Sequence, residues 1–276
     1  MSKPPYFIVD AFVGTLGERV LRGNPAAVVL LEDPRDDEWM QSVAAEMNLS
    51  ETAFVLENSG QPFNLRWFTP ETEVNLCGHA TLAAAHALWE AGRVPRQDEV
   101  RFETLSGLLT AKNEGEWSEL DFPAQPTRFT NAPRDLGLAL GLSPRDPVVY
   151  SRAEDDWLLQ LPTGTVEELK PDFGMLRHLS QQLAIRGVIV TSLAPEGEPY
   201  DFVSRFFGPA VGVDEDPVTG SAHTKLAPFW GKQLKKNEMV GYQASKRGGL
   251  VRVAWRDKRV GLGGKAKVFA EGHLSF

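Results

Sequence analysis

The chain has 276 residues, which suits two domains of ordinary size, and 42% of them are hydrophobic, as in globular proteins that bury substantial cores. Its net charge of −8 argues against a nucleic-acid partner. No apolar run reaches the roughly 20 residues that a membrane span needs, and the first ten residues lack the pattern of a signal peptide. A single cysteine, Cys77, excludes an intrachain disulfide. We therefore expect a soluble, cytoplasmic protein that binds neither nucleic acid nor a membrane.

The first half of the sequence is dominated by short strand-like runs bounded by Gly, Pro, Asn or Glu. Hydrophobic spacing predicts helices over residues 37–47 and 80–91, the second closing on Gly92 as a C-cap. The predicted strands of this half cover residues 7–12, 26–31, 52–56, 64–68, 101–104, 108–112 and 120–122. A stretch with three prolines, residues 122–134, is the predicted linker to the second half.

The second half repeats this mixture of strands and a few helices. Helices are predicted over residues 176–183 and 221–230, and Pro228 is expected to shorten or kink the latter. The glycine-rich run at residues 261–264 precedes a strand and is predicted to be a turn. The predicted strands of this half cover residues 147–151, 157–161, 188–192, 202–207, 250–255 and 267–271.

The order of these elements points to a fold class. Strands are followed by a helix and then by more strands, without strict strand–helix alternation, which favours α+β halves with antiparallel or mixed sheets. No glycine-rich dinucleotide-binding fingerprint follows a strand and opens a helix. We expect no cofactor and no metal.

An internal repeat supports two halves built on one plan. Residues 66–70, Arg-Trp-Phe-Thr-Pro, reappear as Arg-Phe-Phe-Gly-Pro at 205–209, and each copy precedes a Gly-led run of small residues at Gly78 or Gly220. The two arginines are 139 residues apart and the two glycines are 142 residues apart, each about half the chain length. So long a period excludes architectures built from short repeats of about 20–50 residues. A duplicated domain favours a ligand site in the cleft between the halves.

The two Gly-led runs are predicted helix starts. A helix N-terminus offers unpaired N–H groups and partial positive charge, which suit a carboxylate or a phosphate. Thr219 and Ser221 flank the second predicted helix start, at Gly220. With Asp216 they form the densest polar turn of the chain. The alternative is that the small residues only allow close packing of a helix on a sheet. Likewise, Asp216 is a common turn residue, His79 suits a core, and Glu51 suits a solvated surface.

Five segments resemble the phenazine-biosynthesis PhzF-like family. They cover residues 22–28, 48–54, 77–81, 215–222 and 245–249, in order along the chain. The resemblance implies the diaminopimelate-epimerase-like fold, with two pseudo-symmetric halves, each a β-roll or barrel around a central helix, and an active site between them. We expect an N-terminal half over 1–124, completed by a last strand at 265–276, and a C-terminal half over 125–264.

The resemblance also implies roles for individual residues. Glu51 matches the glutamate that moves a proton in the family's phenazine enzyme, a dimer that isomerises a dihydro-hydroxyanthranilate. The implied substrate ligands are Gly78, His79, Asp216, Thr219, Gly220 and Ser221, with Asn24 and Cys77 as accessory residues. The expected partner is a small anionic substrate. The resemblance makes a homodimer one alternative, and the residues leave the oligomeric state open.

Cys77 marks a departure from related chemistries. Amino-acid epimerases of this fold use two thiols, so one cysteine excludes that mechanism. The family's phenazine enzyme has an alanine at this position, and Cys77 is either a second acid/base or a small buried filler, the interpretation we favour. We expect a cofactor-independent isomerase, with a lyase or hydrolase as near variants. The alternative is a non-catalytic anion-binding or regulatory protein that retains the cleft.

Overall fold

The computed structural model describes residues 3–57, 60–131, 133–153 and 155–275. The chain divides into two compact units, the first formed by Met1–Phe122 with Gly261–Phe276 and the second by Pro123–Val260. Among the described residues, no helix combines the length and apolar character that crossing a bilayer requires.

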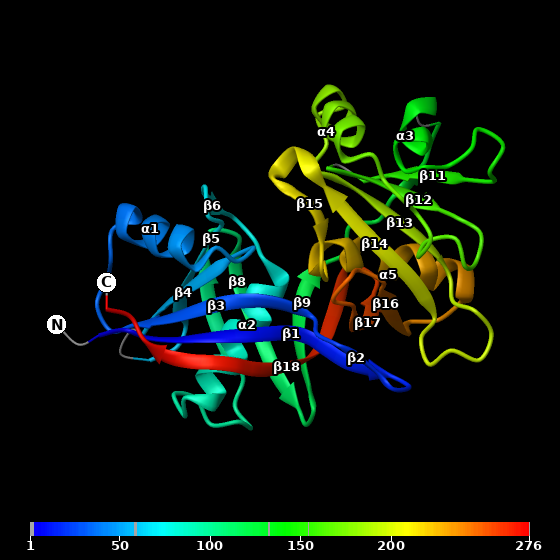
Figure 1. Ribbon diagram of the computed structural model, residues 1–276. Helices are drawn as coiled ribbons and strands as arrows, with labels where there is room; N and C mark the ends of the chain where they lie inside the picture. The colour runs from blue at the N-terminus through cyan, green and yellow to red at the C-terminus, as the bar shows by residue number, and fades with distance from the viewer. Residues whose placement is uncertain (1–2, 58–59, 132, 154, 276) are drawn as a thin grey trace. The chain divides into compact units, whose positions relative to one another are not determined.

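Unit 1 is a closed eight-stranded barrel. Its elements are β1 (Pro5–Leu16), β2 (Arg19–Leu21), β3 (Asn24–Leu31), α1 (Asp37–Met47), β4 (Thr52–Leu56), β5 (Phe63–Phe68), β6 (Glu73–Val74), α2 (Gly78–Glu90), β7 (Val100–Thr104), β8 (Gly107–Glu114), β9 (Trp117–Pro123) and β18 (Arg259–His273). Pairing runs β1-β3-β4-β5-β7-β8-β9-β18 and returns to β1, with β3–β4 and β5–β7 parallel. The first and last strands therefore lie side by side (Figure 1).

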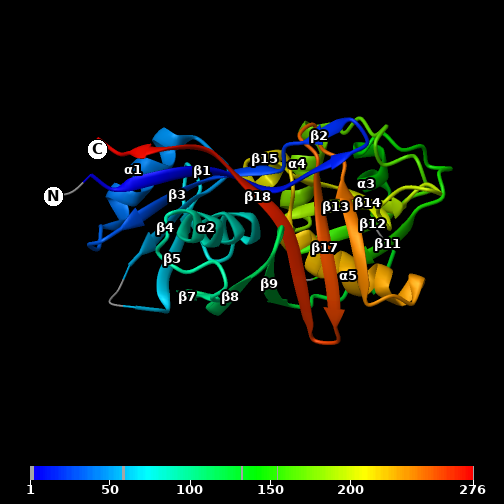
Figure 2. The ribbon, with the colours of Figure 1, turned by 90° about the horizontal axis from the view of Figure 1, so that it is seen from below.

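Helix α2 fills the barrel. Ten of its residues, from His79 to Trp89, are buried, and it contacts β1, β3 and β4 (Figure 2). Its run of Ala and Leu suits this position, because small residues let the helix approach strands on several sides. Helix α1 instead lies on the surface, buries Met40, Val43 and Ala44 at helical spacing, and is capped by Asp36, whose side chain accepts from Trp39 N–H.

Unit 2 is a mixed sheet around a second central helix. Its elements are β10 (Arg128–Phe129), α3 (Arg134–Ala139), β11 (Val149–Arg152), β12 (Asp156–Gln160), α4 (Phe173–Gln182), β13 (Gly187–Leu193), β14 (Phe202–Gly208), the 3₁₀ turn η1 (Pro209–Val211), β15 (Val213–Asp216), α5 (Gly220–Leu234), β16 (Glu238–Gln243) and β17 (Gly249–Arg256). Strands pair in the order β10-β11-β12-β13-β14-β16-β17, and β15 pairs with the end of β14. Eleven of the 15 residues of α5 are buried, all of them between Gly220 and Gly231.

The two units share one topology, which confirms the duplication read from the sequence. In both, an antiparallel pair (β1–β3, β11–β12) leads through a surface helix (α1, α4) to a parallel strand (β4, β13). An antiparallel strand follows (β5, β14), then a short strand (β6, β15) and the central helix (α2, α5). A parallel strand (β7, β16) and a final antiparallel partner (β8, β17) complete the plan.

The structure corrects two local predictions. Residues 261–264 are not a turn but the interior of β18. Pro228 does not shorten α5, which continues to Leu234, beyond the predicted end at residue 230. Proline cannot donate to the carbonyl four residues earlier, that of Thr224, but Gln125 N–H donates to this oxygen at 3.1 Å. The carbonyl thus remains satisfied and the helix continues.

Several elements, most of them short, are absent from the predictions. These are β2, β6, β10, β15, β16, α3 and η1. The segment predicted as a linker, residues 122–134, contains the end of β9, all of β10 and the start of α3, and position 132 lies outside the described residues.

Candidate functional site

In unit 1, four of the residues singled out from the sequence meet at the start of the central helix. Cys77 is the N-cap of α2, and His79 lies in its first turn. Asn24 begins β3 and Glu51 immediately precedes β4. Asn24, Cys77 and His79 are 0%, 7% and 4% exposed, and the side chain of Glu51 is 19% exposed. The structure therefore brings together groups that are 55 residues apart in sequence.

Local backbone geometry places these side chains. Gly23 has φ +62°, and a Cβ there would lie 2.0 Å from the carbonyl oxygen of Ala11, so only glycine allows the approach that precedes Asn24. Asn48 ends α1 in the left-handed conformation with φ 49°, which turns the chain back toward the barrel. Ala27 N–H then donates to the carbonyl oxygen of Glu51 at 3.3 Å, fixing Glu51 beside β3.

The imidazole of His79 is the centre of this cluster. Its Nδ1 lies 3.2 Å from Asn24 Nδ2 and 3.5 Å from Cys77 Sγ, and its Nε2 lies 3.2 Å from Glu51 Oε2. The Asn24 amide can donate to a neutral ring or, after a half turn, accept from an imidazolium. Asn24 is therefore a suitable partner in both protonation states of His79.

Burial and charge set the protonation of the cluster. Burial raises the pKa of the Cys77 thiol, and the nearby Glu51 carboxylate adds to this effect, so the thiol is protonated near neutral pH. Burial lowers the pKa of His79, but interactions with Cys77 and Glu51 more than offset it and leave that pKa well above its usual value. The Glu51 carboxylate contributes to this rise because a negative charge beside the ring favours its protonated form.

The same residues are possible metal ligands. Glu51, Cys77 and His79 each offer a ligand atom, and these atoms lie within 4.8 Å of one another. However, His79 Nδ1 faces Cys77 whereas His79 Nε2 faces Glu51. Because different ring nitrogens make these two contacts, the cluster forms a chain of polar contacts from Cys77 through His79 to Glu51.

In unit 2, the predicted residues lie at the start of α5. Thr219 is the N-cap, and its hydroxyl donates to Asp216 Oδ2 at 2.5 Å. The Gln243 amide accepts from Thr219 N–H at 2.8 Å and donates to the carbonyl oxygen of Asp216 at 2.8 Å. Ser245 Oγ donates to the carbonyl oxygen of Pro217 at 2.7 Å. The turn before α5 is therefore held by β16 and the segment that follows it.

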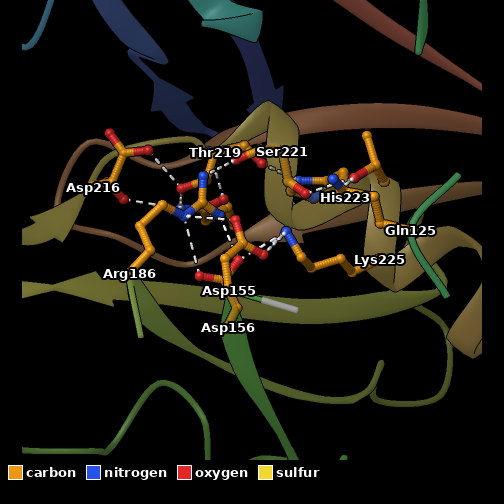
Figure 3. Close-up of polar contacts among 11 residues, drawn as sticks. Gln125, Asp155, Asp156, Arg186, Asp216, Thr219, Ser221, His223 and Lys225 are labelled. Atoms are coloured by element: carbon orange, nitrogen blue, oxygen red, sulfur yellow. Dashed lines mark hydrogen bonds and ion pairs between the residues drawn. The ribbon is translucent and has the colours of Figure 1, made fainter. Parts of the chain in front are cut away.

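The Ser221 hydroxyl has an arginine partner. Arg186 Nη1 donates to Ser221 Oγ at 2.7 Å, and the same guanidinium pairs with Asp156 (Figure 3). Lys225, also on α5, lies 2.9 Å from Asp156 Oδ2 and 3.2 Å from Asp155 Oδ1. Asp156 and Lys225 are 0% and 1% exposed.

Both central helices begin in the same way. Within the described residues, neither N-cap side chain, Cys77 nor Thr219, hydrogen-bonds the first turn of its helix as a cap. The N–H groups of each first turn suit an external acceptor, because the first turn of any helix leaves its N–H groups without helical partners.

Sequence reasoning missed Asp156, Arg186, Lys225 and Gln243. One signal was available for Lys225. It occupies a position that the apolar pattern of α5 assigns to the core, and a buried lysine needs a carboxylate partner. Arg186 and Asp156 lie just before or at the start of neighbouring parallel strands, and their proximity follows only from the pairing of β12 with β13.

Comparisons with known proteins agree with this fold. The family model described as phenazine biosynthesis-like protein matches residues 9–272. An uncharacterized isomerase of Halalkalibacterium halodurans is 48% identical over 96% of both chains. The human phenazine biosynthesis-like domain-containing protein is 40% identical over 99% of both chains.

A solved structure of a PhzF-family protein from Enterococcus faecalis superposes with TM-score 0.89 at 40% identity over 100% of both chains. A hydroxyproline epimerase from Agrobacterium vitis, at 11% identity and TM-score 0.62, shares the fold alone, over 98% of this chain and 92% of its own. Two further curated relatives, from Pseudomonas aeruginosa, also carry the name of uncharacterized isomerases. The chain is therefore an isomerase-class member of the phenazine biosynthesis-like protein family.

Proposed function

We propose that the protein is a cofactor-independent isomerase of a small carboxylate-bearing metabolite, in which Glu51 moves the proton. One observation carries the proposal. The Glu51 carboxylate is four-fifths buried and faces His79 Nε2 at 3.2 Å, beside the uncapped start of a central helix. A buried carboxylate next to a histidine is a suitable acid/base pair for proton transfer at carbon.

The proposed reaction is a proton shift. Glu51 takes a proton from a carbon of the substrate, and the electron pair of that C–H bond moves into the conjugated system attached to the substrate carboxylate. The protonated Glu51 then returns the proton to a different carbon. Atoms and charge balance, because the substrate loses and regains one proton and no electron leaves it.

The neighbours of Glu51 are assigned supporting roles. An imidazolium at His79 donates to the substrate or to Glu51, and Asn24 holds the ring. Gly78 supplies backbone N–H at the start of α2. In unit 2, Asp216, Thr219, Gly220 and Ser221 are proposed to bind polar groups of the substrate.

Hydrogen exchange at carbon tests the proposal. Small anthranilate-like and amino-acid-like carboxylates are incubated with the protein in D₂O, after a thermal-shift screen has selected those that stabilise it. Mass spectrometry then follows deuterium at carbon. We expect Glu51→Gln to lower the exchange rate by about 10²–10⁴-fold, the usual contribution of an acid/base group.

A matched variant separates charge loss from chemistry. Glu46 is an exposed carboxylate on α1, and Glu46→Gln is expected to leave the exchange rate unchanged. Equal exchange by wild type and Glu51→Gln would remove Glu51 from the mechanism. Ligand-induced stabilisation without any exchange would instead favour a non-catalytic anion-binding protein.

A further inference from the structure

Arg186, in unit 2, makes a set of side-chain contacts that the proposed reaction does not explain. Its Nε lies 3.1 Å from Asp156 Oδ1, its Nη2 donates to Asp156 Oδ2, and its Nη1 donates to Ser221 Oγ at 2.7 Å. The guanidinium also stacks over the ring of Phe206 at 5.0 Å. Five donors in a rigid plane make arginine suited to holding two partners at once.

Asp156 is the anchor of this arrangement. It is fully buried, and it pairs with Lys225 as well as with Arg186 (Figure 3). The parallel pairing of Asp156 with Gly187 fixes the distance between the two strands, and Arg186 N–H donates to the carbonyl oxygen of Asp155 at 2.7 Å. Arg186 is therefore held by both its backbone and its side chain.

Stability alone does not account for such a cluster. Asp155, Asp156, Arg186 and Lys225 carry two negative and two positive charges, and removing Asp156 and Lys225, which are 0% and 1% exposed, from water is unfavourable. Apolar residues of similar volume often give equal or greater stability. The orientation that the cluster imposes on Ser221 is a consequence that apolar residues would not reproduce.

That orientation follows from hydrogen-bond chemistry. A guanidinium only donates, so Ser221 Oγ must accept from Arg186. The single hydroxyl hydrogen of Ser221 must then point away from Arg186. Ser221 itself is only partly buried. Asp216 is a further charged neighbour of Arg186 and, as an acceptor, it favours the same guanidinium charge.

We propose that Arg186 is a positioning residue of the substrate site, which turns the Ser221 hydroxyl hydrogen toward the substrate carboxylate. Asp156 holds Arg186, Arg186 donates to Ser221, and Ser221 donates to the ligand. The positive charge of Arg186 also increases the donor strength of the Ser221 hydroxyl. This inference rests on the proposed function, because it takes Ser221 as a ligand of a small carboxylate.

Formate, the smallest carboxylate, is the probe, and formamide is its neutral counterpart. Nuclear magnetic resonance titration at constant ionic strength follows the amide signals of Gly220, Ser221 and Ala222. In the wild type we expect saturable shifts with formate and not with formamide. Arg186→Met and Ser221→Ala are each expected to weaken formate binding by about tenfold, the effect of losing one charge-assisted hydrogen bond.

A double mutant distinguishes positioning from direct binding. If Arg186 acts through Ser221, the double variant binds formate about as weakly as either single variant. Multiplied effects, which would indicate that Arg186 contacts the anion itself, would overturn the positioning role. So would unchanged affinity in Arg186→Met, or wild-type signals that do not saturate. Arg145→Met removes an exposed arginine of unit 2 and is expected to bind formate as the wild type does.

Two further comparisons keep the test decisive. If Arg186→Met does not fold, Arg186→Lys replaces it, because one ammonium group cannot hold Asp156 and Ser221 in the same way, and equal weakening is expected. Undiminished affinity in Arg186→Lys would also overturn the proposal. The exchange experiment on Glu51 is independent of this titration. If Arg186→Met does not weaken formate binding but exchange still depends on Glu51, only the positioning role is refuted. If Arg186→Met weakens formate binding but exchange does not depend on Glu51, only the isomerase is refuted.

Discussion

Arg205 donates from Nε and Nη2 to the two carboxylate oxygens of Glu215, at 2.7 and 3.1 Å. Unit 1 repeats this pair, with Arg66 and Glu73 joined at 2.6 and 2.7 Å. Each guanidinium also lies over a phenylalanine two residues on, Phe207 or Phe68, at 4.9 or 5.1 Å. The repeated Arg-aromatic-Phe motif therefore lies at the end of a strand in each unit. Its arginine holds the short strand that precedes the central helix.

The pair also explains the unequal offsets of the repeat. The arginine and glutamate are 7 residues apart in unit 1 and 10 apart in unit 2, a difference of three. This equals the difference between the offsets of 139 and 142 residues for the arginines and the helix-starting glycines. The 3₁₀ turn η1 lies in the longer segment.

The unit 2 pair is expected to contribute more to stability. Arg205 is 10% exposed against 28% for Arg66, and its Nη1 also donates to the carbonyl oxygens of Val166 and Leu169. Arg205→Met leaves Glu215 and two carbonyls without their donor, so we expect a loss of about 3 kcal/mol. Arg66→Met should cost less, because solvent replaces the lost partner more easily. Denaturant unfolding of both variants measures the difference.

Lys236→Met serves as a control for the loss of an exposed cation from an ion pair. Its ammonium lies 2.6 Å from Asp201 and is 56% exposed, so we expect a loss of less than about 1 kcal/mol. Equal stability losses for Arg205→Met and Lys236→Met would contradict the importance given to burial.

His223 is expected to make the fold sensitive to acid. Burial lowers the pKa of His223 to about 4, against 6.5 for the unperturbed group, although a bond to the Thr219 carbonyl partly opposes the shift. The unfolded chain therefore binds a proton between pH 6.5 and 4 that the native chain does not. The stability that the neutral, buried His223 contributes is present in full above pH 6.5. It falls by about 3 kcal/mol as the pH drops toward 4.

Comparison with His223→Gln isolates this contribution, since other groups titrate in both proteins. The variant should be less stable than the wild type at pH 8 and should lose less stability between pH 7 and pH 4. Unfolding curves across this range give the difference directly. Parallel pH profiles for the two proteins would show that His223 does not titrate as its burial implies.

The sequence predicted α1 and β4 because their patterns are local. Residues 37–47 have helical spacing, and α1 has these bounds. Strand β4 likewise follows its apolar run. The failure at residues 261–264 has a tertiary cause. Glycine is typical of turns, but in β18 a Cβ on Gly264 would lie 2.4 Å from Phe12 Cδ1, so packing against β1 and α2 requires glycine there.

Two glycines of β18 therefore give a matched pair of substitutions. A Cβ at Gly264 meets Phe12 and Leu82, both packed in the barrel, whereas the three atoms nearest to one at Gly261 all belong to the carboxylate end of Glu119, the first at 2.8 Å. We expect Gly264→Ala to cost about 1–3 kcal/mol through overpacking. Gly261→Ala should cost less, because the end of a glutamate side chain can move. Thermal unfolding compares the two, and the reverse order of melting temperatures would contradict this account.

The candidate site was predictable only in part for a similar reason. Glu51, Cys77 and His79 occur in recognisable motifs, and the structure places them together. Arg186 occurs in no such motif, and its connection to Ser221 depends on the pairing of β12 with β13 and on the direction of α5. A residue that acts through another side chain leaves a weaker signal in a single sequence than a residue that belongs to a recognisable motif.

Cys77 offers the last prediction, because it is the chain's only thiol and can be followed without interference. Burial raises its pKa, and the side chain is 7% exposed, so little thiolate is present at neutral pH. We expect a disulfide reagent such as dithionitrobenzoate to modify Cys77 at least about a hundredfold more slowly in the native protein than in denaturant.

The same thiol distinguishes a buried filler from a second acid/base. Alanine removes the sulfur and leaves only a small cavity, so a filler predicts that Cys77→Ala keeps Glu51-dependent deuterium exchange within about threefold and loses about 1 kcal/mol of stability. An acid/base predicts a loss of about 10²–10⁴-fold in exchange with normal stability. Because His79 Nδ1 lies 3.5 Å from the sulfur and Asn24 can hold the ring without it, we expect the first result.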